Sequence, residues 1–381
     1  MRWIRSLVAA AMLATLLTGC WGIREIEYMI YVNTVGVDYK DGKFVLHAQL
    51  VSFFNIAKKE AAAQTEQQLI SIARADGETF DKAIFNLYAT AQQRIAWSHV
   101  KTILFSEAAL SPERITEVLD VWDRYYEFRY TNWIFATKDP IESIFNAMPA
   151  QNISVIYSQL NDPTDIYSQN SDIVPIYLFE FTRSWHEKGE TLKIPFLRIA
   201  NNWTENKRVS PKLEMIGTGF FHNSRYKGYI PRSKTRGLRW LNNKAVRANL
   251  FIKQNKKPAV MLVMEKVKAE IKPQVKQGKA EFQVKVTASG NIPQLISDLT
   301  EKQLEQLAVQ EIKKEISDSY LQGIAKGIDV LNLSEALFRS NPAEWHRLAV
   351  KGELPLDENS LSGIDVKATV FSGGISKIKK D

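Results

Sequence analysis

The chain contains very little cysteine. Cys20 is the only one among its 381 residues, which excludes an intramolecular disulfide and a metal site built from several thiolates. Its content of 45% hydrophobic and 24% charged residues is typical of a folded globular protein. Stability must therefore come from packing, and 381 residues suffice for two or three domains.

Long apolar runs are missing beyond the N-terminus. Residues 7–17 form an unbroken apolar or small run that follows Arg2 and Arg5. This run is too short to span a bilayer, which takes about 20 apolar residues, but it is typical of a signal-peptide core. We therefore expect residues 1–19 to be a signal peptide.

The end of this leader reads Leu17-Thr18-Gly19-Cys20, the pattern of a bacterial lipobox. The pattern requires a thiol for lipid attachment, small residues just before it and an apolar residue three positions upstream. We expect cleavage between Gly19 and Cys20, and an N-palmitoyl, S-diacylglycerol cysteine at position 20, because a single acyl chain holds a protein only marginally. The alternatives are an ordinary signal peptide with a chance cysteine and an uncleaved membrane-associated helix.

The charge is modestly basic. Removing the leader takes away Arg2 and Arg5 and no acid, which lowers the formal charge from +8 to +6. This excess favours an anionic lipid surface, whereas no nucleic-acid-binding motif is present and no nucleic-acid partner is expected. The densest basic stretch, residues 225–247, is interrupted by glycine, proline and tryptophan. We interpret it as a solvated hairpin face, or a surface that faces lipid or an acidic partner.

Catalytic signatures are absent as well. The sequence has no His-Glu-x-x-His helix, Gly-x-Ser-x-Gly elbow or phosphate-binding glycine loop, and its five histidines are far apart: His47, His99, His186, His222 and His346. Gly217-Thr218-Gly219 indicates a close-packed strand or bulge. Asp162 and Asp165 lie in a stretch of turn-forming residues, which indicates a solvated loop. We predict no catalytic residue, no metal site and no cofactor, and hence no enzyme.

Nine tryptophans invite the idea of a ligand site, but they do not cluster at a helical or strand period. Core and interface packing is therefore the default. Trp240 and Trp345 are candidates for exposed contact residues, although a buried position is favoured for Trp345.

Periodicity predicts a mixed chain. In the first half, strands are expected over 31–38, 44–51, 100–105, 132–137 and 194–199, the last a short or edge strand because of Pro195. Helices are expected over 79–95, 112–126, 140–147 and 174–187. In the second half we expect strands over 212–222, 227–230, 245–253, 259–272, 279–288 and 363–371, and helices over 300–326, 333–338 and 342–350.

These elements predict an α+β fold, a multidomain mixed α/β chain with mainly antiparallel sheets and packed helices. Residues 201–211 are polar and turn-rich, the best candidate for a linker. We therefore expect an N-terminal domain over 20–205 and a C-terminal domain over 212–381. The latter could divide into a small middle unit, 212–244, and a sheet with one long helix, 245–381.

The order of several motifs resembles the Ger(x)C family of spore germination lipoproteins. The resemblance runs from Cys20 to about Phe371 and rests on these stretches: Cys20-Trp21 with Arg24-Glu25-Ile26, Val35-Gly36-Val37-Asp38, Gly217-Thr218-Gly219-Phe220-Phe221, Gly327-Ile328-Asp329-Val330, and Asn341-Pro342-Ala343-Glu344-Trp345. Trp21-Gly22 departs from the acidic or polar residue expected after the tryptophan.

The resemblance implies a lipid-anchored C subunit of a nutrient germinant receptor on the outer face of the spore inner membrane. Its partners would be integral membrane A- and B-type subunits, and its role would be nutrient-triggered spore germination. One alternative is a solute-binding lipoprotein of an ABC importer, which the hairpin-rich second half disfavours. Another is a lipid-anchored cell-wall hydrolase or protease, which the missing nucleophile and metal patterns disfavour.

Overall fold

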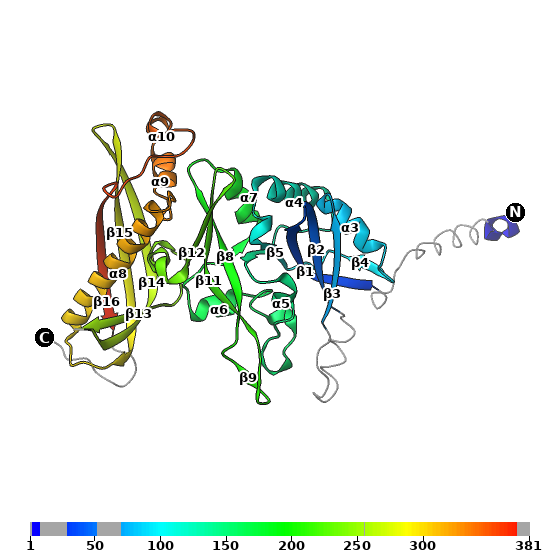
Figure 1. The fold of residues 1–381 in the computed structure, drawn as a ribbon, viewed down its shortest axis with the longest axis horizontal. Helices are drawn as coiled ribbons and strands as arrows, with labels where there is room; N and C mark the ends of the chain where they lie inside the picture. Colours follow the sequence, from blue (N-terminus) through cyan, green and yellow to red (C-terminus); the bar gives the residue numbers. More distant parts are fainter. Residues whose placement is uncertain (1, 8–28, 52–69, 255, 372–381) are drawn as a thin grey trace.

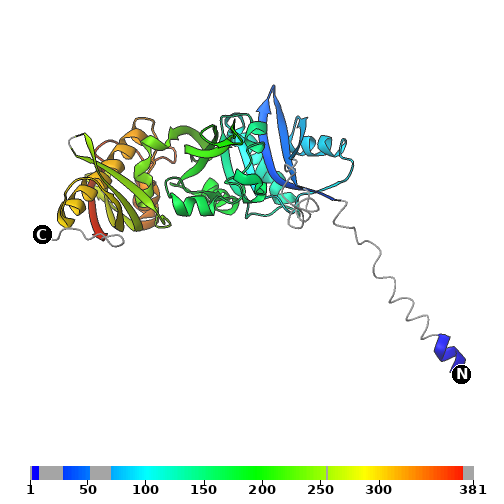
Figure 2. The same ribbon diagram turned by 90° about the horizontal axis from the view of Figure 1, so that it is seen from below.

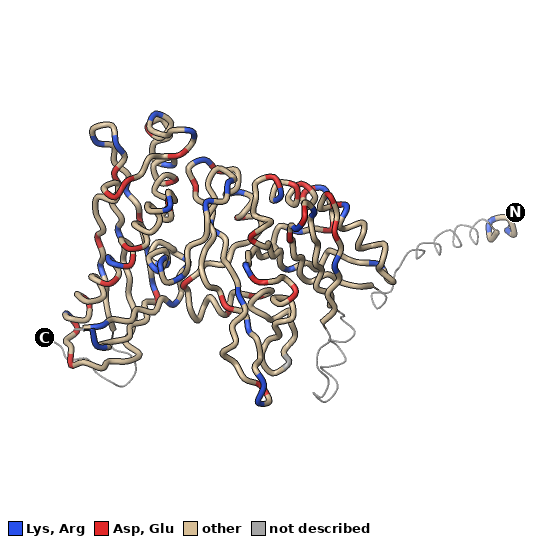
Figure 3. The backbone as a smooth tube through the Cα atoms, viewed as in Figure 1, with Lys and Arg blue, Asp and Glu red and all other residues tan. Residues whose placement is uncertain are grey.

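The structure is a computed structural model of the chain, and it describes residues 2–7, 29–51, 70–254 and 256–371. The molecule is elongated, with two bodies in a row (Figures 1 and 2). We call residues 29–231 the first body and residues 232–371 the second body. Acidic and basic residues are interspersed along both (Figure 3). Within the described ranges, no helix is both long and apolar enough to cross a membrane.

The first body is built on one ten-stranded sheet. Its main strands lie in the order β12-β11-β8-β6-β5-β1-β2-β3, while β4 pairs with β1 and β7 with β6. The central strands β1, β5, β6 and β8 are parallel to one another, and the outer strands pair antiparallel. The strands are β1 (Met29–Lys40), β2 (Lys43–Val51), β3 (Ser71–Gly77), β4 (Arg94–Ala96), β5 (Thr102–Ser106), β6 (Trp133–Thr137), β7 (Ile176–Tyr177), β8 (Thr191–Ala200), β11 (Lys212–His222) and β12 (Arg225–Pro231).

Helices cover both faces of this sheet. Side chains of β5 alternate between two cores: Ile103 and Phe105 pack into one with α3, α4 and α7, and Leu104 into the other with α5. Because both faces are covered, β5 reads as a continuous apolar run. The helices are α3 (Phe80–Tyr88), α4 (Pro112–Arg124), α5 (Ile141–Phe145), α6 (Thr164–Gln169) and α7 (Leu178–His186), with short 3-10 turns η2 (Glu107–Ala109), η3 (Ala150–Asn152) and η4 (Val155–Tyr157).

The second body has a four-stranded sheet with helices on one face. Its strands lie in the order β13-β14-β15-β16, and β16 joins β15 in parallel. The strands are β13 (Ala248–Gln254), β14 (Lys257–Lys276), β15 (Lys279–Leu295) and β16 (Leu361–Phe371), and the helices are α8 (Glu301–Ile324), α9 (Leu333–Ser340) and α10 (Pro342–Leu348). Long helix α8 begins with a capping box between Thr300 and Gln303 and lays its apolar face on the sheet.

Two-residue turns set the hairpin registers. Asp41 and Gly42 have φ angles of 52° and 79° and join Lys40 to Lys43, its register partner. Gln277 (φ 49°) and Gly278 (φ 77°) do the same between β14 and β15. Left-handed backbone at both turn positions matches the strand twist and favours glycine. Asp-Gly is a frequent pair at such turns, and Asp41-Gly42 forms one here.

The predicted fold class, α+β with mainly antiparallel sheets and packed helices, is confirmed. The strand expected over 194–199 was predicted to be short or at an edge of the sheet, and this was wrong. It corresponds to β8, which is ten residues long and lies between β6 and β11. Pro195 is tolerated there because β6 pairs with β8 only at Phe196 and Leu197.

The sheet continues across the residues that we expected to be a linker. Residues 201–211 join β8 to β11, which pair from Ala200 with Lys212 to Thr191 with His222. These residues also hold a small hairpin of β9 (Thr204–Glu205) and β10 (Arg208–Val209). The domain limits at 205 and 212 stay a prediction.

Candidate functional site

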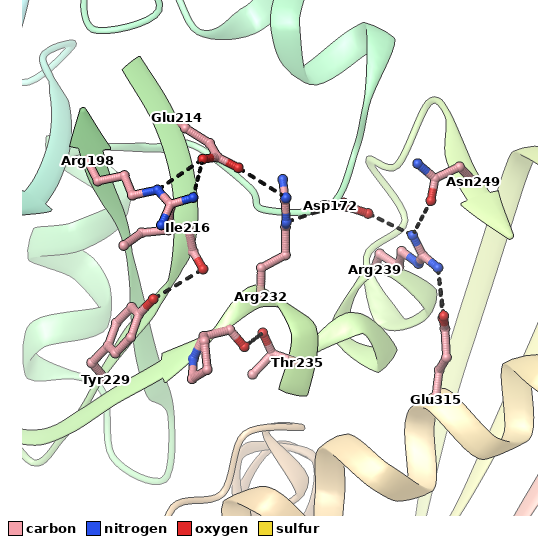
Figure 4. Close-up of polar contacts among 11 residues, drawn as sticks. Asp172, Arg198, Glu214, Ile216, Tyr229, Arg232, Thr235, Arg239, Asn249 and Glu315 are labelled. Carbon is pink, nitrogen blue, oxygen red and sulfur yellow. Dashed lines mark hydrogen bonds and ion pairs between the residues drawn. The ribbon is translucent and has the colours of Figure 1, made fainter. Parts of the chain in front are cut away.

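A row of alternating charges crosses the junction between the two bodies (Figure 4). On the sheet of the first body, Arg198 Nε and Nη2 lie 3.0 and 2.8 Å from Glu214 Oε2. Glu214 Oε1 accepts a third hydrogen bond to this carboxylate, 3.2 Å long, from Arg232. Arg232 belongs to the 3-10 turn η5 (Arg232–Lys234), the first element of the second body, and its Nε lies 4.0 Å from Asp172 Oδ2.

The row ends in a buried cluster around Arg239, whose side chain is only 1% exposed. Arg239 belongs to η6 (Arg236–Leu241) and donates through Nη1 to Asp172 Oδ1 at 2.7 Å. Its Nη2 lies 2.9 Å from both carboxylate oxygens of Glu315 on α8. Trp240 Nε1 also donates to Glu315, at 2.6 Å. A buried arginine thus joins a loop of the first body to the long helix of the second.

A glycine lets η6 approach α8 this closely. The backbone N–H of Gly237 donates to Ser319 Oγ at 2.9 Å. A Cβ atom at position 237 would lie 2.3 Å from the carbonyl oxygen of Glu315, which no side chain can accommodate. The glycine therefore fixes the distance at which Arg239 and Glu315 meet.

A second polar attachment lies beside α9 and the loop after α10. Asn332 Oδ1 accepts from the backbone N–H of Thr191 at 2.9 Å. The two ring nitrogens of His222 each lie 3.2 Å from a carbonyl oxygen, one of Glu190 and one of Gly352. The two bodies are therefore held at two places rather than by one flexible link.

Between the two attachments lies a cavity of about 560 Å³ with both charged and apolar side chains in its lining. Lys193, Glu190 and Arg183 line it from the first body, and Glu335 and Arg339 from the second. Burial lowers the pKa of Lys193, while nearby Asp329 and Glu335 act in the opposite direction. Burial also raises the pKa of the Asp329 carboxyl, which accepts from the Ser334 N–H at 2.7 Å.

The charged groups of the row bind one another. A buried ion pair adds little net stability, but substitution of either partner alone is strongly destabilising. The row therefore acts mainly to orient the two bodies. The row fixes how the second body sits on the first.

The structure corrects two interpretations of the sequence. Trp240 is not an exposed contact residue, because it is 0% exposed and its indole N–H donates to Glu315. For Trp345 the favoured buried position is confirmed: it is 2% exposed, and its indole N–H donates to Ser334 Oγ at 2.8 Å. The basic stretch 225–247 is not uniformly solvated, because Arg239 is buried against Asp172 and Glu315. These acids are far from Arg239 in sequence, so composition alone could not pair them. A signal was present in Glu315 itself, which interrupts the apolar stripe between Ile312 and Ile316.

Other residues singled out from the sequence do not converge. Gly217 and Gly219 lie in β11 with a register shift between Met215 and Gly217, which confirms the strand-and-bulge interpretation. Asp165 is exposed on α6. In the part of the chain that the structure describes, no three histidine, cysteine or acidic side chains are grouped to hold a metal ion. Gly19 and Cys20 lie outside the described residues.

Comparisons with known proteins find similarity to spore germination proteins. A family model described as spore germination protein N-terminal domain matches residues 22–199, and one described as spore germination B3/GerAC like, C-terminal, matches residues 216–358. The chain is 24% identical to spore germination protein KC of Bacillus subtilis (strain 168), with 93% of each chain covered. It is 19% identical to spore germination protein B3 of the same organism, over 72% of this chain and 70% of the relative.

A solved structure shares the fold. The crystal structure of the GerBC protein matches with a TM-score of 0.50 at 16% identity, covering 88% of this chain and 96% of that one. The likeness extends over both bodies.

Proposed function

Because the chain belongs to the Ger(x)C family of spore germination proteins, we propose that it is the lipid-anchored C-type subunit of a nutrient germinant receptor. It works on the outer face of the spore inner membrane by binding integral membrane A- and B-type subunits, and nutrient-triggered germination requires it. The observation that carries the proposal is the match to both family models in order, together with near-complete coverage of spore germination protein KC.

The anchor in this proposal is Cys20. Each buried methylene contributes about 0.8 kcal/mol, so several acyl chains hold a protein firmly where one does not. The first described strand begins at Met29, nine residues after Cys20. An extended segment of this length spans at most about 30 Å, which keeps the first body close to the bilayer.

The junction supports a role in protein–protein interaction. The charged row and the Asn332 attachment hold the bodies in one orientation, so a partner that binds both finds a preformed surface. Preorganisation lowers the entropic cost of binding. Anchoring also raises the local concentration of the chain for partners in the same membrane.

The test is Cys20→Ala in the sporulating host, in a strain without other C-type subunits. We expect the protein to leave the membrane fraction and germination with one nutrient set to fail. Thr18→Ser, which keeps a small residue upstream of the cysteine, is the matched control and should leave both unchanged.

Two outcomes would contradict parts of the proposal. Release from the membrane with normal germination would refute the receptor role and favour a solute-binding lipoprotein of an ABC importer. Retention in the membrane would refute the anchor.

A further inference from the structure

The β9–β10 hairpin projects from the edge of the first body (Figure 1). Its turn residues Asn206 and Lys207 have φ angles of 50° and 64°, and Arg208 pairs with Glu205 across it. The hairpin falls between the two family models, which end at residue 199 and begin at residue 216. It is therefore a feature of this chain beyond what those models describe.

The acidic residue of the hairpin is turned toward the body. Glu205 accepts from Ser210 Oγ at 2.6 Å, from the Gln151 N–H at 3.0 Å and from Lys212 Nζ at 3.3 Å. These hydrogen bonds, with that of Ser210 the strongest, lower the pKa of Glu205. They also fix the base of the hairpin, and Lys212 balances the charge of its only carboxylate.

The tip is left cationic. Lys207 and Arg208 are both exposed, and neither takes part in an ion pair among the described residues. In Figure 3 the end of the projection carries basic residues beside one acidic position.

Apolar side chains flank these cations. Trp203 is 51% exposed and Val209 is 63% exposed, beside the two ends of the short ladder. Ile153, 48% exposed, follows η3, which is tied to the hairpin through Gln151. Tryptophan prefers the headgroup level of a bilayer, and lysine and arginine near the surface are attracted to anionic lipids. Exposed apolar side chains next to exposed cations are more favourable at an anionic lipid surface than in water.

We propose that the β9–β10 hairpin docks on an anionic phospholipid surface. Trp203 and Val209 enter the headgroup region, and Lys207 and Arg208 bind lipid phosphates. The inference rests on the proposed function in that the anchor brings this body to the bilayer. A single tether leaves the molecule free to turn, whereas a second contact decides which face meets the membrane.

The experiment supplies the tether independently of acylation. The chain from residue 20 onward, carrying Cys20→Ser and an N-terminal hexahistidine tag, is bound to nickel-chelating vesicles that contain phosphatidylglycerol. Without Cys20 the chain has no thiol, so Val209→Cys places a polarity-sensitive fluorophore at the hairpin alone. Val350→Cys, at a position 61% exposed on the second body, is the matched control.

We expect a blue shift and quenching by a bilayer-bound quencher for the Val209 probe, and neither for the Val350 probe. Lys207→Ala with Arg208→Ala should reduce the docked fraction relative to the undocked one by about 25-fold, since each cation contributes about fivefold near an anionic surface. Vesicles of phosphatidylcholine alone should give a similar loss.

Identical spectra for the two probes would overturn the proposal. So would a Val209 probe that stays in water on vesicles but is shielded when the A- and B-type subunits are added, because the hairpin would then bind protein. Failure of the Cys20 anchor in the host affects neither readout, so the two proposals fail separately.

Discussion

The two bodies bury their sheets differently. In β5 of the first body, Ile103, Leu104 and Phe105 are consecutive and all buried. In β15 of the second body, Val284 and Val286 are buried while Lys285 between them is exposed. A sheet covered on both faces requires apolar residues at every position, and a sheet covered on one face only at every second.

This difference determines which parts of each body can present polar side chains to solvent. The first body has few free sheet positions, so its exposed features lie in loops and hairpins. The second body keeps one face of its sheet in solvent. The buried charges of the Arg239 cluster lie where the two bodies meet. Substitutions there are expected to change the free energy of unfolding most.

The largest effect is expected from Glu315→Ala. It leaves Arg239, 1% exposed, without its main carboxylate, and removing one partner of a buried pair costs about 3–5 kcal/mol. The free energy of unfolding from urea titration measures this loss. Arg198→Ala, at the solvent end of the row with a side chain 53% exposed, is the control and should cost about 1 kcal/mol or less.

The double variant Arg239→Met, Glu315→Leu sharpens this test. Replacing both charges by apolar groups should recover part of the stability, because no unpaired arginine or glutamate remains buried, while Asp172 keeps only Arg232, at 4.0 Å, as its cationic partner. A Glu315→Ala variant as stable as the Arg198→Ala control would show that the two bodies do not depend on the cluster.

A set of alanine substitutions tests the two kinds of sheet directly. Ile103→Ala and Leu104→Ala should each cost about 2–5 kcal/mol, since both side chains leave cavities in well-packed cores. In β15, Val284→Ala should cost about 2 kcal/mol, and Lys285→Ala should stay within about 0.5 kcal/mol. Urea titration of the four variants gives the values. A large loss for Lys285→Ala would contradict a solvated face.

The smallest expected effect depends on pH and on His47 in the first body. Burial lowers the pKa of His47 below its ordinary 6.5, although Glu142 acts against this. The unfolded chain therefore binds a proton that the folded chain does not, and stability is lost as the pH falls below 6.5. The loss is at most about 1.4 kcal/mol per pH unit.

His47→Gln should reduce this dependence, measured as urea midpoints at about pH 7.5 and about pH 5.5, and the remainder includes His99, whose pKa burial also lowers. His346→Gln, at an exposed position of the second body, should retain the dependence of the unmodified chain. Equal slopes in the two variants would refute the assignment to His47.

Much of the fold could be predicted from the sequence because many of its signals are local. The Thr300 cap, the Asp41-Gly42 turn and the alternation along β15 each lie within a few residues. Strand β3 was missed because Arg74 and Asp76 give it the composition of a loop, which an edge strand tolerates.

The order of the sheet and the junction could not be predicted in the same way. The parallel pairing of β1 with β5 and of β6 with β8 joins distant segments that carry no local signal. The Arg239 cluster likewise joins three segments that are distant in sequence. Its one local signal is Glu315, an acidic residue within the apolar face of α8. The lipid anchor rests on residues 17–20, outside the described part of the chain, and stays a prediction.

The position of β16 has a consequence for the order of folding. This last strand pairs with β15 across an intervening segment that contains α8, α9 and α10, and it buries Val366, Ala368 and Val370. The first body contains all its strands once β12 has been synthesised. Domains fold from the N-terminus during synthesis. The first body can therefore form early, whereas the second keeps an open edge on β15 until almost the whole chain has been made.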